Sequence, residues 1–240
     1  MMSFAAIAPP PGVIAERDRL LHLRLPAGAP LPAATRQTDK QLRLRVRIRA
    51  EASRIIARRG LDGAALVDVA RAAGISNSSI STYYPRRREL IHDIIHTHID
   101  ALLEHVGTVD DNYADADPFL RLEAVILALL DAVCAAPDEH QVMLAALPTL
   151  PDAERDTLRY YGRLLAFRLG GAVEAALPDI AAQRELLAPL TMSLLGMATY
   201  ANLWFRSDGA LTRSAYAHFI ARAIVDGGEA VLREREQTEV

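Results

Sequence analysis

The sequence predicts an all-α fold, in which a small three-helix head precedes a larger helical body. About half of its residues are apolar (51%), which is ample for a core in a chain of 240 residues. Alanine, leucine and arginine dominate and aromatic residues are sparse (5%), a composition that favours helices over sheets. The apolar residues also recur at the spacing of amphipathic helices, and prolines separate one such stretch from the next.

The N-terminal part divides into an extension and a first helix. Residues 1–38 are rich in proline and alanine, and we expect them to be largely disordered. Residues 42–49 alternate aliphatic residues with arginine, which is the one strong strand signal in the chain. We nevertheless expect a helix there, because Ile48, Ala52 and Ile56 continue at helical spacing.

Residues 66–84, LVDVARAAGISNSSISTYY, are typical of two short helices joined by a tight turn. Gly74 stands where the first helix has to end in a left-handed conformation, which only glycine adopts without steric cost. Ser76 or Asn77 can cap the second helix, and Ile80 anchors it in the core. The pattern therefore predicts a helix-turn-helix.

The second of these helices is small and polar on its outward side. Short hydroxyl and amide groups suit base edges and phosphates, and the major groove of DNA admits one α-helix. An ordinary helical hairpin is the alternative, but the combination of alanine, glycine, isoleucine and a Ser/Thr-rich helix favours DNA recognition. The outward positions are Asn77, Ser78, Ser79, Ser81 and Thr82.

Charge is distributed unevenly along the chain. Residues 1–90 carry a net charge of +9 and residues 91–240 one of −12, so the overall −3 hides a basic front and an acidic rear. A solvated charge run is one explanation. Here the basic run flanks the helix-turn-helix, which favours contact with phosphates and a nucleic-acid-binding head on an acidic body.

A dense pattern extends over residues 46–90. A helix ends at Gly60, Asp62 follows in a short loop, and after the helix-turn-helix a Tyr-Tyr-Pro step at 83–85 leads to Arg87 and a long helix. This pattern resembles the DNA-binding domain of the TetR family of transcriptional regulators. The resemblance implies that the segment before Gly60 is helical, and it implies a dimeric, ligand-controlled DNA-binding protein.

The resemblance also indicates which residues meet DNA. The alanine pair at 64–65 stands where the family has a threonine, Ser81 where it has a tyrosine, and Arg88 where it has an acidic residue. Tyr83 takes the position of a phosphate-binding residue, with a role in the core equally open, and Tyr84 matches a buried phenylalanine. The predicted DNA-binding residues are Arg43, Ser76, Asn77, Ser78, Ser79, Ser81, Thr82, Tyr83 and Arg87.

The rest of the chain is predicted to hold six helices, bounded by prolines and glycines. They are expected near 86–106, 118–136, 139–147, 152–177, 183–206 and 211–233. The predicted domains are a disordered extension at 1–38, a helix-turn-helix DNA-binding domain at 39–85 and a helical regulatory and dimerisation domain at 86–240.

The last two predicted helices carry small residues that allow close approach, among them Gly196, Ala201 and Ala223. By resemblance, such a pair forms the interface of a homodimer; completion of a monomer core is the alternative. A dimer would place two recognition helices about 34–36 Å apart on a palindromic operator.

The resemblance further implies a pocket for a small apolar effector in the body. Methionine and aromatic side chains adapt to irregular apolar ligands, although each alone is more often part of a core. The predicted lining residues are His96, Phe119, Met143, Tyr161, Met192, Tyr200 and Trp204, with Cys134, Phe167 and Asn202 as further candidates.

One competing group suggests a different function. His92 and His96 share a helix face at a spacing that can bind a metal, so a small helical metal-binding protein or hydrolase is the alternative. Such a hydrolase would need a third ligand and a general base, and no HExxH motif is present. Because no serine elbow, phosphate loop, CxxC pair or dinucleotide-binding glycine pattern appears, we expect neither catalysis nor a cofactor.

The remaining signals concern location. Cys134 is the only cysteine, and the N-terminal twelve residues lack a basic region and contain three prolines, which is unlike a signal peptide. We also expect no run long and apolar enough to span a bilayer, hence a cytoplasmic protein without a membrane partner. The leading hypothesis is a ligand-responsive, sequence-specific transcriptional regulator, more specifically a repressor. A DNA-binding architectural protein without ligand control is a further alternative.

Overall fold

The computed structural model describes residues 39–206 and 208–238. The expectation of disorder at residues 1–38 concerns a segment outside this range. The chain divides into two compact units, residues 1–46 and residues 47–240, and the division falls within the first described helix. The predicted domain boundary at residue 85 lies inside the second unit and stays a prediction.

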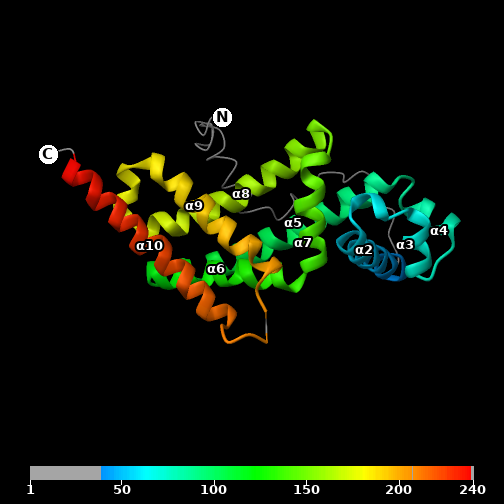
Figure 1. The fold of residues 1–240 in the computed structure, drawn as a ribbon, viewed down its shortest axis with the longest axis horizontal. Coiled ribbons are helices and arrows are strands. Elements are labelled where there is room, and N and C mark those ends of the chain that lie inside the picture. Colours follow the sequence, from blue (N-terminus) through cyan, green and yellow to red (C-terminus); the bar gives the residue numbers. More distant parts are fainter. Residues whose placement is uncertain (1–38, 207, 239–240) are drawn as a thin grey trace, which may run out of the picture. The chain divides into compact units, whose positions relative to one another are not determined.

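The predicted helices of the head are present (Figure 1). Residues 42–49 belong to a helix and not to a strand, as the spacing of Ile48, Ala52 and Ile56 predicts; all three are buried. The elements are α2 (Asp39–Arg59), the 3-10 turn η2 (Leu61–Gly63), α3 (Leu66–Ala72) and α4 (Asn77–Tyr83).

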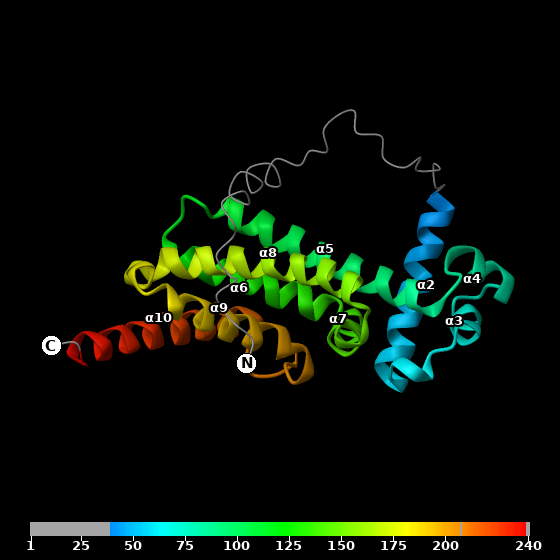
Figure 2. The same ribbon diagram turned by 90° about the horizontal axis from the view of Figure 1, so that it is seen from above.

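The six predicted helices of the body are also present, and the described residues contain no strand (Figure 2). They are α5 (Arg87–Asn112), α6 (Pro118–Ala135), α7 (Pro137–Ala146), α8 (Asp152–Ala176), α9 (Arg184–Thr199) and α10 (Arg213–Thr238). Three short 3-10 helices join them: η3 (Leu147–Thr149), η4 (Pro178–Ala182) and η5 (Tyr200–Leu203).

Three helix ends differ from the prediction by five residues or more. α10 continues past its expected end near residue 233 to Thr238. α5 continues past its expected end near Val106 to Asn112, and Gly107 lies buried within it. The helix expected to reach Arg206 instead ends at Thr199 and tightens into η5. Pro189 lies inside α9, a helix that continues past it.

The centre of the body is formed by α5 and α6. α5 packs against α6, α7 and α8, and α6 also packs against α8, α9 and α10. Because α6 is surrounded in this way, six of its apolar residues are fully buried, and each such side chain stabilises the fold by roughly 1.5–3 kcal/mol. They are Leu122, Val125, Ile126, Leu129, Leu130 and Val133.

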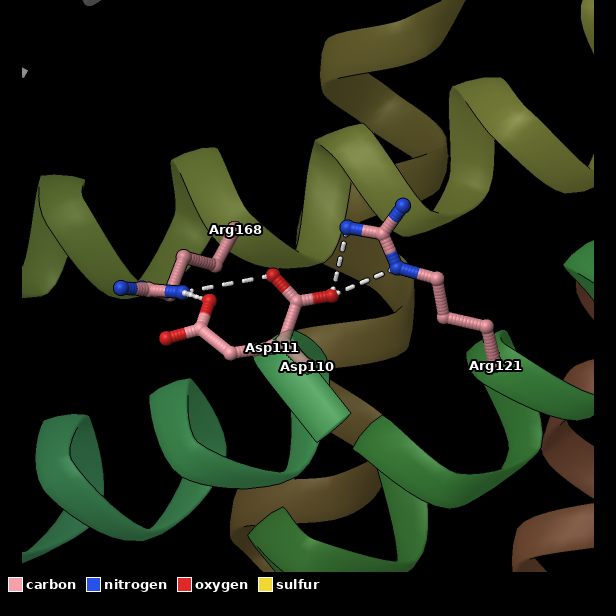
Figure 3. A network of polar contacts seen from close by, with 4 residues as sticks. All are labelled: Asp110, Asp111, Arg121 and Arg168. Carbon is pink, nitrogen blue, oxygen red and sulfur yellow. Dashed lines mark hydrogen bonds and ion pairs between the residues drawn. The ribbon is translucent and has the colours of Figure 1, made fainter. Parts of the chain in front are cut away.

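A buried carboxylate ties the C-terminal end of α5 to α6 and α8 (Figure 3). Asp110 accepts a hydrogen bond from Arg121 Nε at 2.7 Å and one from Arg168 Nη1 at 3.4 Å. Arg168 also donates to Asp111 at 3.1 Å. A Cβ atom on Gly107 would lie 3.2 Å from the Arg168 guanidinium carbon, so the glycine makes room for this arginine.

One segment of the described chain, Glu185–Leu203, is long and apolar enough to cross a membrane by length and composition alone. The expectation that no such segment exists was therefore wrong. α9 alternates between side chains that enter the core, such as Leu194 and Ala198, and exposed apolar ones, such as Met192. Because both its buried and its exposed positions include apolar residues, the segment has a high mean hydropathy. A single segment of this kind is weak support for a membrane span.

Candidate nucleic-acid interface

The turn between α3 and α4 has the predicted left-handed glycine. Gly74 has a φ of +65°, and the N–H of Ile75 bonds back to the carbonyl of Ala70 at 3.0 Å. This is the way a glycine-terminated helix satisfies its last carbonyls. The turn lets α4 pack against α3 (Figure 2).

α4 is held by its inward side and capped at its start. Ile80 is fully buried and Tyr84, directly after the helix, is also buried, as predicted. The Ser76 hydroxyl accepts a hydrogen bond from the N–H of Ser79 at 3.1 Å, which makes Ser76 the N-cap. Tyr83 is half-buried.

The outward side of α4 is a continuous polar surface, which we call the α4 face. Four of the five predicted side chains are exposed, and Ser79 is half-buried. Ser81 Oγ donates to the carbonyl of Asn77 at 3.1 Å, and Thr82 Oγ1 donates to the carbonyl of Ser78 at 3.2 Å. The α4 face consists of Asn77, Ser78, Ser81 and Thr82.

The hydroxyls at the start of α4 bond to one another. Ser76 Oγ lies 2.9 Å from Ser78 Oγ and 2.8 Å from Ser79 Oγ, and either member of each pair can donate. These contacts link the side chains in the first turn of α4. The first turn of α4 contains no acidic side chain, so no carboxylate on it would repel a phosphate.

The N-terminal part of α5 is tied to the head by charged side chains. Asp93 accepts hydrogen bonds from the Tyr84 hydroxyl and from Arg49 Nη1, the latter at 3.2 Å. Arg87 donates to the carbonyl of Leu61 at 2.7 Å. These contacts join the start of α5 to the segments that flank α3 and α4.

The predicted basic residues have different surroundings. Arg43 is exposed on α2. Arg87 already has partners within the protein, the Leu61 carbonyl and Asp62, whose carboxylate lies 3.5 Å away. Arg88 lies 3.5 Å from Glu154 of α8. Phosphate contact by Arg43 or Arg87 stays a prediction.

The structure places the predicted effector-binding residues in separate groups. His96 and Tyr161 meet edge to face, with ring centroids 5.4 Å apart. Phe119 instead contacts His218, and Trp204 contacts Tyr216 at 5.0 Å. Met143 is half-buried in α7, whereas Met192 and Tyr200 are exposed.

An apolar cavity of about 180 Å³ lies between α9 and α10. None of the predicted effector-binding residues lines it. Its walls are formed by Leu186, Pro189, Leu190, Ser193, Gly228 and Val231.

A buried histidine pair was missed by the sequence reasoning. His98 Nε2 of α5 lies 2.9 Å from His140 Nδ1 of α7, and both side chains are buried. Burial lowers the pKa of each imidazole from 6.5 to about 4. His98 follows Ile94 and Ile95 at helical spacing, which was the available signal that it faces the core.

In the pair proposed for metal binding, the two rings lie 6.1 Å apart and one of them has a carboxylate beside it. His96 Nδ1 lies 2.9 Å from Asp100, one turn further along α5. No group of three or more His, Cys, Asp or Glu side chains gathers in a metal-binding arrangement within residues 39–206 and 208–238. The geometry therefore offers the metal-binding alternative no third ligand.

Comparison with known proteins identifies both parts of the chain. Residues 48–94 match the bacterial regulatory proteins of the tetR family, and residues 115–227 match the tetracyclin repressor-like C-terminal domain. A TetR-family transcriptional regulator from Bordetella parapertussis 12822 is 30% identical, with a TM-score of 0.70, over 76% of this chain and 94% of that one. The chain belongs to the TetR family.

Other solved structures share the fold at lower identity. AibR, solved with isovaleryl coenzyme A and operator DNA, is 21% identical, with a TM-score of 0.62, over 76% of this chain and 98% of that one. The ketosteroid transcriptional regulator KstR2 of Mycobacterium tuberculosis is 16% identical, with a TM-score of 0.64, over 76% of this chain and 93% of that one. No curated protein matches this TetR-family chain.

Proposed function

We propose that this TetR-family protein is a cytoplasmic, ligand-responsive repressor that binds a palindromic operator as a homodimer and releases it when a small apolar molecule binds the body. It acts by binding and not by catalysis. The observation that carries the proposal is the α4 face, an exposed polar surface on a helix whose other side is anchored by Ile80 and Tyr84.

The α4 face suits the major groove. A helix of this kind fits the groove, and hydroxyl and amide groups bond to base edges and phosphates. Around it, Ser76, Ser79 and Tyr83 would contact the DNA backbone. Arg87 would add positive charge to the same contact and exchange its partner in the protein for a phosphate. Arg43, exposed on α2, is proposed as a further phosphate contact.

Exposed apolar side chains on α9, on α10 and in the segment between them support the homodimer. Isolated exposed apolar residues are normal, but a series along two adjacent elements is typical of an interface. α9 and α10 pack together, and small residues such as Gly196, Ala223 and Gly227 leave room for a second copy. The exposed apolar side chains are Met192, Tyr200, Leu203, Trp204, Phe219 and Val231.

Two considerations support an effector that acts through the body. Among proteins of this fold, AibR was solved with isovaleryl coenzyme A and operator DNA, and KstR2 is a ketosteroid regulator. In addition, α5 makes contacts with the head at Asp93 and runs into the core of the body. An effector favours DNA release only if it binds the released conformation more tightly than the bound one.

The proposal is tested by selecting duplex sequences that the full-length protein binds and measuring their affinity by gel shift. We expect a palindromic consensus, and the double change Ser81→Ala with Thr82→Ala should abolish the preference for it. Thr97→Ala, an exposed threonine on α5, is the matched control and should bind like the wild type. Equal affinity for consensus and random duplex in the wild type would refute sequence-specific binding.

The dimer is tested separately by light scattering. Phe219→Glu places a charge on an exposed aromatic position of α10 and should convert the dimer to a monomer. Leu120→Glu, on an equally exposed apolar residue of α6, is the control. A monomeric wild type, or a dimeric Phe219→Glu variant, would contradict the proposed interface.

A further inference from the structure

We propose that Ser81 and Thr82 read DNA as hydrogen-bond acceptors, so that each faces a base carrying an exocyclic amine: N6 of adenine or N4 of cytosine. The inference rests on the proposed function, because it assigns the chemistry that α4 recognises in the groove.

The polarity of these two hydroxyls follows from bonds within α4. Ser81 Oγ lies 3.1 Å from the carbonyl oxygen of Asn77, and Thr82 Oγ1 lies 3.2 Å from that of Ser78. A carbonyl oxygen only accepts, so the single hydroxyl proton lies in each of these bonds. What remains toward solvent is a pair of lone pairs on each oxygen, and both side chains are exposed.

The neighbouring polar residues do not have such a defined direction. Ser76, Ser78 and Ser79 bond among themselves, and either hydroxyl of each pair can be the donor. Asn77 carries both a donor and an acceptor in its side-chain amide. Ser81 and Thr82 are therefore the members of the α4 face whose recognition chemistry is fixed before DNA binds.

This direction selects among the groups displayed in the major groove. Guanine N7 and O6, adenine N7 and thymine O4 are acceptors, whereas adenine N6 and cytosine N4 are donors. To donate to an acceptor on a base, the hydroxyl of Ser81 or Thr82 would have to break its hydrogen bond to the helix carbonyl. A donor on a base can instead bond to the hydroxyl oxygen while that hydrogen bond stays intact. Because consecutive residues on a helix point about 100° apart, the two hydroxyls meet different bases.

The test uses the operator selected with the full-length protein and base analogues at each position of one half-site. Purine in place of adenine, or 2-pyrimidinone in place of cytosine, removes the amine and leaves the other groove atoms. The 7-deaza analogues of adenine and guanine instead remove the N7 acceptor. Affinities are measured by fluorescence anisotropy at one salt concentration for the wild type and for Ser81→Ala, Thr82→Val and Thr82→Ser.

Removing the amine opposite Thr82 should weaken the wild type roughly fivefold, the factor expected for one hydrogen bond. Thr82→Val keeps the shape of the side chain without the hydroxyl, so it should be insensitive to the same analogue. Thr82→Ser should regain the sensitivity, and Ser81→Ala should lose sensitivity at a different position. Comparing each variant with the wild type removes the effect of the analogue on the DNA itself.

The inference is overturned if the variants lose sensitivity to the 7-deaza analogues, because the hydroxyls would then donate, or if every variant responds to the amine analogues as the wild type does. Either result leaves a selected operator, so the proposed function stands. Failure to select any sequence would instead refute sequence-specific binding itself.

Discussion

The buried pair His98–His140 makes the stability of the body depend on pH. Both imidazoles are almost fully inaccessible, with 4% of His98 and 0% of His140 exposed. Their pKa values are lowered from 6.5 to about 4, chiefly because burial disfavours the charged form, and for His98 also because His140 lies beside it. Lowering the pH from 7 to 5 is therefore the perturbation.

The sign follows from proton binding by the two states. Between pH 6.5 and pH 4 the unfolded chain binds protons at these histidines that the folded protein does not bind. The two histidines are buried in their neutral form. The stability that this form contributes is fully present above about pH 6.5 and is lost as the pH falls toward 4. At pH 5 the loss relative to pH 7 is about 2 kcal/mol for one such histidine and about 4 kcal/mol for both.

The loss is measured by urea unfolding, followed by circular dichroism at fixed protein concentration. The double variant His98→Leu with His140→Leu removes both titrating groups and should flatten the pH dependence by about 4 kcal/mol, whereas His105→Gln, at an exposed histidine, should not. An equal pH dependence in the wild type and the double variant would refute the reasoning.

A second measurement covers the case in which the double variant does not fold. Nuclear magnetic resonance of the wild type should show that the ring signals of His98 and His140 do not titrate between pH 8 and pH 5. Titration of the buried pair near the ordinary histidine pKa would contradict the assignment.

Three further predictions concern the caps, turns and ion pairs of the structure. Ser76→Ala removes the N-cap of α4 and should lower the free energy of unfolding by about 1 kcal/mol, measured by urea unfolding, and weaken operator binding; unchanged stability and affinity would contradict the cap. Gly74→Ala meets open space but must adopt a φ of +65°, so strain of about 1 kcal/mol should lower the melting temperature; no lowering would mean that the turn relaxes. Asp110→Asn removes the buried carboxylate that binds Arg121 and Arg168 and should destabilise the protein to urea by about 2 kcal/mol, although Arg168 keeps its contact with Asp111. Asp115→Asn, at an exposed position, is the control, and equal effects of the two changes would contradict a role for the buried ion pair.

The features that the sequence predicts correctly depend on local chemistry. The left-handed Gly74, the cap by Ser76 and the burial of Ile80 follow from rules that act within a few residues. Residues 42–49 were correctly predicted as a helix, because the helical spacing of Ile48, Ala52 and Ile56 continues beyond the alternating stretch. The resemblance to the TetR family separated Tyr84, which is buried, from the exposed residues of the α4 face.

The features that it misses depend on partners far away in the chain. The Gly107–Arg168 contact joins α5 to α8, and the His98–His140 pair joins two helices that no local pattern relates. Nothing in the sequence indicated that Arg87 donates to the carbonyl of Leu61, and its predicted phosphate contact stays a prediction. The sequence suggested aromatic residues for the effector pocket by residue type alone. Which of them lie together depends on how the six helices of the body pack.

The packing of the body limits how an effector can act. α5 is fixed at one end by Asp93, which binds Arg49 and Tyr84 of the head, and at the other by Asp110. Between these ends the side chains that α5 and α6 bury form a continuous apolar core. Under the proposed function, a ligand that enters there would displace packed side chains, and DNA would be released if the ligand bound that altered conformation more tightly than the DNA-bound one. We expect the displacement in the middle of α5, away from the charged contacts at its ends, where the packing against α7 includes the hydrogen-bonded imidazoles of His98 and His140.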